Sequence, residues 1–383
     1  EALAFDKVLS GNRDISCMTC HLPTAGTGDG RSLSIGQGGT GLSTDRVHPD
    51  GAFIPRNAPP LFNLSALESM FWDGRVSVDA AGEFHTPAGA ALTRDMTNVF
   101  EFGAVSALAL FPVLSREEMR AASGNELAAI SDDDPAGIWR GLMQRLGAIP
   151  EYRRLFEKAY PGTRFEDMTF AHASNAVAGF MLAKFAFTDT PWDRFLSGKD
   201  MALSHDQLTG AQTFLSSRCS VCHTGPALTD NRYHNVAVAQ FGPGQGNGPS
   251  GRDDFGRFNV TGVAADRYAF RTPPLRNVTL TSPYGHDGAT FSAREFIEHY
   301  SESDIKLRTF AMPAQEPMLW GTLLTNFDDI LANRDTILDG VVLSAETVDQ
   351  LMAFMTALTD PAVRSLDRVA PKRVPSGLPV DRP

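Results

Sequence analysis

The feature that most constrains this chain is the motif Cys-x-x-Cys-His, which occurs at residues 17–21 and again at residues 219–223. In such a motif both thiols form thioethers to one haem, and the adjacent histidine ligates the haem iron. A single copy is also compatible with a redox dithiol or with half of a zinc site. Two copies that use all four cysteines of the chain instead indicate two c-type haems. Their attachment residues are Cys17, Cys20 and His21 in the first copy and Cys219, Cys222 and His223 in the second.

The distance between the two motifs predicts two haem domains. The motifs begin 202 residues apart (219 − 17), which is too far for a short-period repeat. We expect an N-terminal haem domain over residues 1–187, a crossover linker over 188–204 and a C-terminal haem domain over 205–383. Residues 22–64 and 224–290 are rich in glycine and proline and lack periodicity. The expected fold class is therefore mostly α, with two cytochrome c-like haem domains, long irregular loops and little strand.

Four helices can be placed from apolar periodicity and capping patterns. The amphipathic patterns predict helices over 170–185 and 344–359, the second with Ser344 as its N-cap. Capping-box patterns predict two more, over 116–130 after Ser115-x-x-Glu118 and over 205–216 after Ser204-x-x-Gln207. The tail after Pro361 is rich in proline and arginine, so we expect an extended strap or a disordered segment.

Charge and cysteine usage limit the partners and the compartment. The formal net charge of −11 argues against nucleic acid and anionic membranes as partners. No run approaches the ~18–20 apolar residues that a membrane span needs. Bacterial c-type haem is attached outside the cytoplasmic membrane, so we expect a periplasmic protein. The chain begins at Glu1 without a charged and then apolar leader, which we interpret as a mature form whose signal peptide has been removed.

Beyond the haem motifs, the chain resembles the bacterial dihaem cytochrome c peroxidase family, and within it the tryptophan-modifying branch of MauG and MbnH. The resemblance covers nearly the whole chain and depends on the order and spacing of short strings. Besides the two haem motifs, these are Ser34-Ile-Gly36, Arg56-Asn57-x-Pro59, Phe71-Trp72-Asp73-Gly74-Arg75, Pro274-Leu-Arg-Asn277, Pro283-Tyr-Gly-His-Asp-Gly288 and the helix Arg294–Tyr300.

The resemblance implies a division of labour between the haems. The haem on His21 would meet hydrogen peroxide, and the haem on His223 would transfer electrons. Trp72 would lie between them, although the residues alone favour an ordinary core indole there. Glu101 would be the distal general acid and base for cleaving the peroxide bond, although an isolated glutamate is otherwise a solvated helix edge.

The resemblance also implies one calcium ion between the domains. Its ligands would be Asn57 and the carbonyl groups of Thr281 and Pro283, which are the hard oxygen donors that calcium prefers. No acidic loop in the sequence announces such a site.

Two departures from the family pattern favour the MauG-like branch. Plain peroxidases of the family carry a histidine ligand where this chain has Gln37, so the peroxide-binding haem is expected to have an open sixth position. His48 is a spare candidate for that position. Plain peroxidases also place a methionine ligand where this chain has Tyr300, which would ligate the second iron through oxygen. An ordinary helix aromatic remains the alternative for Tyr300, and the reserve ligands are His299, Met312 and Met318.

These residues predict an enzyme with either of two activities. The first is an oxidoreductase that reacts with H2O2, forms a two-ferryl (bis-Fe(IV)) state and oxidises a residue of a partner protein, tryptophan above all. The alternative is a cytochrome c peroxidase that reduces H2O2 to water with electrons from a small cytochrome or cupredoxin. The partner would accordingly be a periplasmic protein substrate or an electron-donor protein. A plain dihaem electron carrier is disfavoured by an acid and base residue beside an open haem.

Overall fold

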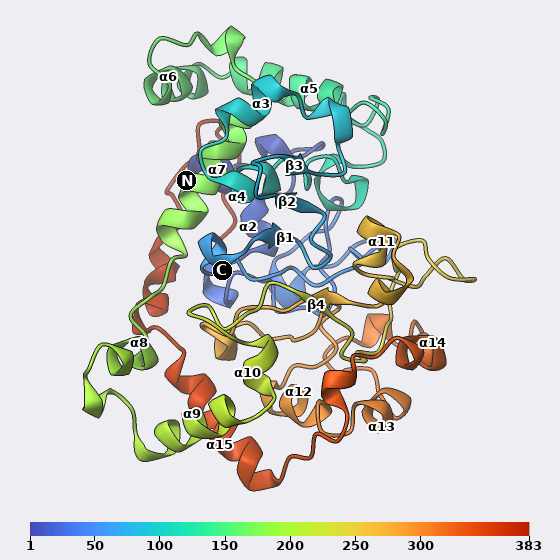
Figure 1. Ribbon diagram of the computed structural model, residues 1–383. Helices are drawn as coiled ribbons and strands as arrows, with labels where there is room; N and C mark the ends of the chain where they lie inside the picture. The colour runs from blue at the N-terminus through green and yellow to red at the C-terminus, as the bar shows by residue number, and fades with distance from the viewer. Residues whose placement is uncertain (383) are drawn as a thin grey trace.

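The computed structural model describes residues 1–382, and they form two halves that meet along one interface (Figure 1). The first half holds the helices α1 (Ala2–Phe5), α2 (Cys17–Cys20), α3 (Arg94–Val99), α4 (Gly103–Leu108), α5 (Pro135–Gly147), α6 (Pro150–Ala159) and α7 (Phe170–Lys184), with the strands β1 (Ser69–Met70), β2 (Val76–Val78) and β3 (Phe84–His85). The second holds α8 (Pro191–Leu196), α9 (His205–Ser216), α10 (Cys219–Cys222), α11 (Phe258–Thr261), α12 (Ala293–His299), α13 (Ser303–Arg308), α14 (Phe327–Ala332) and α15 (Ala345–Ala357), with β4 (Tyr233–His234) and β5 (Phe270–Arg271).

The expected fold class, mostly α with little strand, is confirmed. The strands are two or three residues long and form two small antiparallel sheets, β1-β2-β3 and β4-β5. Long segments between the helices are irregular, including most of residues 22–64 and 224–290. Among residues 1–382, no helix combines the length and the apolar character that crossing a membrane requires.

Three of the four predicted helices are confirmed. α7 matches the stretch predicted over 170–185, and α15 begins after Ser344, whose side chain accepts a hydrogen bond from the Thr347 backbone amide. α9 begins after the predicted capping box of Ser204 and Gln207. α9 and α15 pack together at the base of the second half (Figure 1).

The helix predicted over 116–130 is wrong beyond its first turn. Ser115 does cap the amide of Glu118, but residues Arg116–Arg120 form a single π-helical turn. The chain then leaves the helix at Ala121, which has φ 70°, a left-handed value that a continuing helix cannot contain. The sequence analysis also missed α5 and α6, which begin at Pro135 and Pro150. Proline at the first helical position is a recognised start signal.

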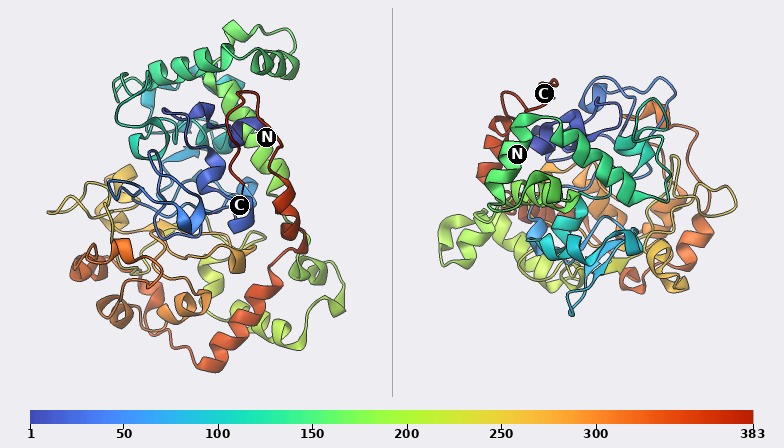
Figure 2. Two further views of the ribbon diagram at one scale, coloured as in Figure 1. Left: turned by 180° about the vertical axis from the view of Figure 1, so that it is seen from behind. Right: turned by 90° about the horizontal axis from the view of Figure 1, so that it is seen from above.

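The tail after Pro361 is an ordered strap on the first half. Residues 361–381, here called the strap, begin as the 3-10 helix Pro361–Arg368 and run beside α7 toward the N-terminus (Figure 2). Val363, Leu366 and Val374 are buried in the apolar core of the first half. The C-terminal domain was predicted to span residues 205–383, but residues 361–381 pack on the first half.

Buried ion pairs join the two halves. Arg56 of the first half donates to both carboxyl oxygens of Asp254 in the second, at 2.6 and 2.8 Å, and to Asp73 at 2.6 Å. Arg31 pairs with Glu316 at 3.0 Å, and both side chains are buried. These pairs fix how the irregular loops of one half lie against the other.

Candidate functional site

Each Cys-x-x-Cys segment forms one helical turn, which explains the spacing. Ser16 and Thr19 form a capping box around α2, and the Ser16 amide donates to Thr19 Oγ1 at 2.9 Å. Residues three apart lie on the same face of a helix, so Cys17 and Cys20 can both reach one ligand. α10 repeats this arrangement with Cys219 and Cys222. All four thiols are free of disulfides.

Both motif histidines are oriented for ligation through Nε2. His21 Nδ1 lies 2.9 Å from the carbonyl oxygen of Thr27, and His223 Nδ1 lies 3.0 Å from that of Leu228. Such a bond orients the ring and leaves the other nitrogen for a metal. Burial lowers the pKa of both imidazoles, which favours the neutral form that binds iron.

Each motif opens onto a cavity. The N-terminal cavity, of about 170 Å³, is lined by Cys17, Cys20 and His21. The C-terminal cavity, of about 400 Å³, is lined by Cys219, Cys222 and His223. Four residues line both cavities: Asn57, Pro60, Trp72 and Arg271. Free thiol pairs, an oriented imidazole and a largely apolar cavity at each motif fit a covalently held haem.

Trp72 lines both cavities and so lies in the wall between them. The residue is 8% exposed, and its indole Nε1 donates to the carbonyl oxygen of Asn57 at 2.9 Å. The turn that carries it is held from the second half, because the Arg271 amide donates to the Trp72 carbonyl at 2.8 Å.

Glu101, predicted as the distal residue, does not line the N-terminal cavity, so its distal role stays a prediction. Glu101 is exposed at the turn between α3 and α4, and its backbone amide donates to Asn175 Oδ1 at 3.2 Å. It is absent from the lining of either cavity within residues 1–382. The family resemblance alone implied the distal position, whereas the residues themselves indicated a solvated helix edge, and the carboxylate is exposed in the structure.

Glu118 is the carboxyl group that lines the N-terminal cavity. The π-helical turn Arg116–Arg120 carries it, and insertions of this kind often occur at functional sites. Burial raises the pKa of Glu118, with Arg75 acting in the opposite direction. From the sequence, Glu118 was predicted only as part of a capping box. The sequence signal for its burial was that Glu118 follows a second glutamate and directly precedes a methionine, which is buried in the structure.

Gln37 is turned away from the N-terminal cavity. Its side chain is buried, donates to the Asp14 carboxylate and does not line the cavity. Its backbone amide donates to Glu117 at 3.0 Å, so the loop packs against the π-helical turn. His48 is exposed and its Nδ1 bonds the Asp50 amide. Neither residue is placed to contact a ligand of this cavity.

Tyr300, at the end of α12, lines the C-terminal cavity together with the second haem motif. Burial, and secondarily the thiols of Cys219 and Cys222, raise the pKa of its hydroxyl. Tyr268 and Tyr284 line the same cavity, but their hydroxyls are bonded to Asp253 and to the Val278 carbonyl. Among the residues described, the Tyr300 hydroxyl has no such partner.

The reserve ligands are placed elsewhere. His299 Nε2 bonds the Val236 carbonyl at 2.7 Å, and neither Met312 nor Met318 lines the C-terminal cavity in the part of the chain described. Met355 of α15 does line it. From the sequence, Met355 is only one member of an apolar helix face, and its position in that pattern is typical of core packing.

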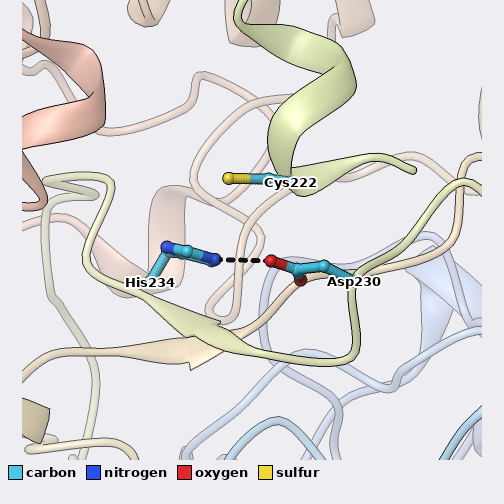
Figure 3. Close-up of side chains that lie close together, drawn as sticks. All are labelled: Cys222, Asp230 and His234. Atoms are coloured by element: carbon cyan, nitrogen blue, oxygen red, sulfur yellow. Dashed lines mark hydrogen bonds and ion pairs between the residues drawn. The ribbon is translucent and has the colours of Figure 1, made fainter.

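His234 lies beside the second motif between two carboxylates. Its Nε2 is 2.9 Å from Asp230 and its Nδ1 is 2.5 Å from Asp335 (Figure 3 shows Asp230 and Cys222). Contacts with Cys222, Asp335 and Asp230 raise its pKa to about 10. Cys222, Asp230 and His234 are close enough together to hold a metal ion. However, a thioether to haem would consume the Cys222 thiolate, so the trio is not an independent metal site.

The three residues predicted as calcium ligands, Asn57, Thr281 and Pro283, all line the C-terminal cavity. Asn57 Nδ2 donates to the carbonyls of Arg31 and Ser32, at 2.9 and 3.2 Å, and its amide to that of His286 at 2.9 Å. The atoms that these three residues can offer to a cation are amide and carbonyl oxygens. Such oxygens fit a hard cation.

Comparison with known proteins identifies the family. A family model described as di-haem cytochrome c peroxidase matches residues 1–201. The chain belongs to the di-haem cytochrome c peroxidase family. It is 31% identical over 295 residues to cytochrome c551 peroxidase of Pseudomonas aeruginosa, which covers 77% of this chain and 68% of that protein. It is 28% identical over 301 residues to methylamine utilization protein MauG of Methylorubrum extorquens, covering 78% of this chain and 67% of that one.

A solved structure supports the fold of this family member. The crystal structure of a MauG-like protein associated with microbial copper homeostasis matches 94% of this chain and 88% of its own, with a TM-score of 0.65 and 24% identity. Family membership gives the coarse function: the chain is an H2O2-dependent oxidoreductase with two c-type haems. The two motifs described above supply their attachment residues and proximal histidines.

Proposed function

We propose that this protein reacts with H2O2 at the N-terminal haem and uses two oxidising equivalents, shared by both haems, to oxidise a residue of a partner protein, tryptophan above all. The observation that carries the proposal is Tyr300, whose hydroxyl faces the C-terminal cavity without a hydrogen-bond partner among residues 1–382. An oxygen donor stabilises a more oxidised iron than a thioether does, because it carries more negative charge.

The N-terminal cavity supports reaction without prior reduction. His21 is the one histidine in its lining among the described residues, so no second imidazole competes for the open face. The Gln37 side chain is held by Asp14, on a loop that packs against the π-helical turn. Peroxide can therefore enter without a ligand having to leave first.

Glu118 provides the general acid and base. Its carboxylate would take the proton from one peroxide oxygen and return it to the leaving oxygen, as cleavage of the O–O bond requires. In the complete reaction, H2O2 accepts two electrons and two protons and leaves as two water molecules. The partner residue loses the two electrons and two protons, so the reaction balances.

Trp72 provides the contact between the two haems. It lines both cavities, and bonds to Asn57 and Arg271 hold its indole and its backbone. Such a placement suits electron transfer from the C-terminal haem to the N-terminal one. The partner protein would then be oxidised at the C-terminal haem, away from the peroxide.

A one-step reaction tests the proposal. Mixing the diferric protein with one equivalent of H2O2 is expected to produce a near-infrared charge-resonance band shared by the two haems. A partner protein should then lose that band stoichiometrically and gain a modified tryptophan, which mass spectrometry would identify. If peroxide is consumed only after half-reduction by a small cytochrome or cupredoxin, the protein is instead a plain cytochrome c peroxidase, the activity named for its Pseudomonas relative.

We further infer one calcium ion at Asn57, Thr281 and Pro283, and a periplasmic location. A buried carboxyl supports the calcium site: neither oxygen of Asp287 has a hydrogen-bond partner among the described residues, and the preceding His286 carbonyl accepts from Asn57. Dialysis against a chelator should change the haem spectra, and added Ca²⁺ should restore them. Two haem domains, residues 1–187 with the strap and residues 205–360, complete the proposal.

A further inference from the structure

Two buried arginines of this protein, Arg271 and Arg46, lack an acidic partner among the described residues. Most buried arginines are paired: Arg56 with Asp73 and Asp254, and Arg31 with Glu316. Arg271 is only 4% exposed, yet it forms no ion pair with any residue from 1 to 382. Burying a charge without a counter-charge is costly, so such a residue requires an explanation.

The hydrogen bonds of Arg271 leave its charge poorly satisfied. Nε donates to the Phe71 carbonyl and Nη1 to the Thr272 carbonyl, both at 3.3 Å, beyond the usual range for such bonds. A guanidinium has five donors, and Nη2 has no partner among the described residues. Arg46 is also buried without an acid, but three carbonyl oxygens accept from it at 2.7–3.0 Å.

The position of Arg271 is fixed, and it faces both cavities. It lies in β5, opposite Tyr233 of β4, and its amide donates to the Trp72 carbonyl at 2.8 Å. Its side chain lines the N-terminal and the C-terminal cavity alike. Burial lowers its pKa to about 10, so the guanidinium stays charged at neutral pH. The wall between the cavities therefore presents a rigid, uncompensated cation.

We propose that Arg271 binds the propionate carboxylate of a covalently attached haem and thereby raises the reduction potential of that haem. When cysteines hold the vinyl side of a haem, its two propionates are the anionic groups that remain. A planar guanidinium is suited to a carboxylate, because it can donate two parallel hydrogen bonds. Arg271 lines both cavities, so the redox titration below identifies which haem supplies the propionate.

The inference rests on the presence of two haems and not on Tyr300, peroxide or a protein substrate. Its failure is therefore distinguishable from a failure of the proposed function. A fixed cation on a propionate disfavours the extra positive charge of ferric iron. Removing that cation should favour the ferric state and lower the midpoint potential.

The test is a redox titration of each haem in the intact dihaem protein. In Arg271→Gln, the equilibrium constant for reducing at least one haem should fall about tenfold, which is about 59 mV for a one-electron couple. Arg271→Lys should recover most of the potential, since it retains the charge. The haem whose midpoint falls is the one whose propionate is bound, and a fall in both assigns one propionate from each.

Arg257→Gln is the matched control. Arg257 is partly buried nearby, donates to the carbonyls of Asp73 and Gly74 at 3.0 Å, and lines neither cavity. The substitution Arg257→Gln removes one guanidinium charge, as Arg271→Gln does, but at a residue that lines neither cavity. Midpoints in Arg271→Gln that match those of Arg257→Gln would overturn the proposal.

A second measurement covers the case in which Arg271→Gln fails to take up haem. Resonance Raman propionate-bending bands respond to hydrogen bonds on the carboxylate. These bands should differ between the wild-type protein and Arg271→Lys and should be the same in wild type and Arg257→Gln. Identical bands in wild type and Arg271→Lys would show that Arg271 does not contact a propionate.

Discussion

Glu117 and Glu118 are neighbours on one π-helical turn, yet their carboxyl groups meet different surroundings. Glu117 is exposed, and its carbonyl holds the loop at Gln37. Glu118 lines the N-terminal cavity, and burial raises its pKa. A raised pKa brings a carboxyl closer to the working pH, at which it can both take and return a proton. The adjacent pair therefore offers a test residue and its own control.

Replacing Glu118 with glutamine should slow the reaction with H2O2 by about 10²–10⁴-fold, the usual loss when a general acid and base is removed. Stopped-flow mixing of the diferric protein with peroxide would measure this rate. The exposed variants Glu117→Gln and Glu101→Gln should react like the wild type. If Glu101→Gln reacts slowly and Glu118→Gln reacts at the wild-type rate, the general acid and base is Glu101.

The pH profile of the same rate should report Glu118. Only the ionised carboxylate can accept the first proton, so the wild-type rate should fall as the pH drops through the pKa of Glu118. Because burial raises that pKa, the fall should occur above the ordinary range of glutamate. In Glu118→Gln, this limb of the profile should be missing. Its persistence would assign the titration to another group.

Replacing Tyr300 with methionine should raise the midpoint potential of the C-terminal haem and remove the near-infrared band. A neutral thioether compensates positive iron less well than a tyrosine oxygen does. Spectroelectrochemistry would measure the potential, and Tyr284→Phe, which alters a bonded hydroxyl of the same cavity, should leave it unchanged. A methionine–iron band in the wild-type spectrum would instead point to Met355.

At the scale of elements, the sequence predicted what depends on local signals. α7, α9 and α15 have clear periodicity or caps, and all three form as expected. The π-helical turn does not follow from its capping pattern, because Ala121 turns the chain after five residues. This explains why Glu118 was missed: a capping box normally directs that side chain back to the helix start, whereas here the turn directs it into a cavity.

The strap is the element whose role local sequence could not reveal. Its buried residues Val363, Leu366 and Val374 have no periodic partners nearby, and their contacts lie in the other half of the chain. Polar contacts reinforce the position: Ser376 Oγ donates to Asp6 at 2.6 Å, and Lys7 pairs with Asp381 at 2.6 Å. Compositional bias suggested a strap or disorder, and only tertiary packing decides between them.

Truncating Val374 to alanine should lower the free energy of unfolding by about 1–3 kcal/mol, because this side chain is 1% exposed in the core of the first half. Denaturant titration followed through haem absorbance would measure the change. Val263→Ala, at a side chain that is 53% exposed and lines neither cavity, should change stability by no more than about 0.5 kcal/mol. Equal effects of the two substitutions would show that the strap contributes no packing energy.

At the scale of the whole molecule, Arg56 connects the halves through Asp254, and its second ion pair, with Asp73 of the first half, makes the fold sensitive to acid. Burial alone would raise the pKa of Asp73, but Arg56 and Arg75 outweigh burial and lower it to about 2. A carboxylate whose pKa is lower in the folded state stabilises the fold above its unfolded pKa. That contribution is lost as the pH falls from about 4, the ordinary value for aspartate, to about 2.

Asp73→Asn should therefore be less stable than the wild type by about 2 kcal/mol at pH 7, and the difference should close as the pH falls from about 4 to about 2. Thermal unfolding at a series of pH values would measure both curves. Asp95→Asn, at an exposed carboxyl, should follow the wild-type curve throughout. A stability difference that is independent of pH would show that Asp73 acts through packing and not through its charge.

The family and its two haem motifs could be predicted from the whole sequence because their order and spacing are properties of the chain itself. Trp72 and Tyr300 could be named as candidate site residues for the same reason, since each is embedded in a recognisable string. Arg271 could not be singled out, because its importance comes from two cavities that meet only in the folded protein. Gln37 shows the same limit. The sequence identifies a glutamine at this position, but the hydrogen bond to Asp14 that turns its side chain away from the N-terminal cavity depends on the tertiary structure.

The position of the strap also determines when it can dock during synthesis of the chain. Thr19, inside the first haem motif, donates to Asp381 at 2.5 Å, and 362 residues separate the two. At about 5–20 residues per second, a ribosome delivers Asp381 roughly 20–70 s after Thr19. Cys17 and Cys20 thus exist for that interval on a nascent chain that cannot yet carry the strap. Docking of the strap is therefore a late step, which follows the synthesis of the first haem motif and of the rest of the chain.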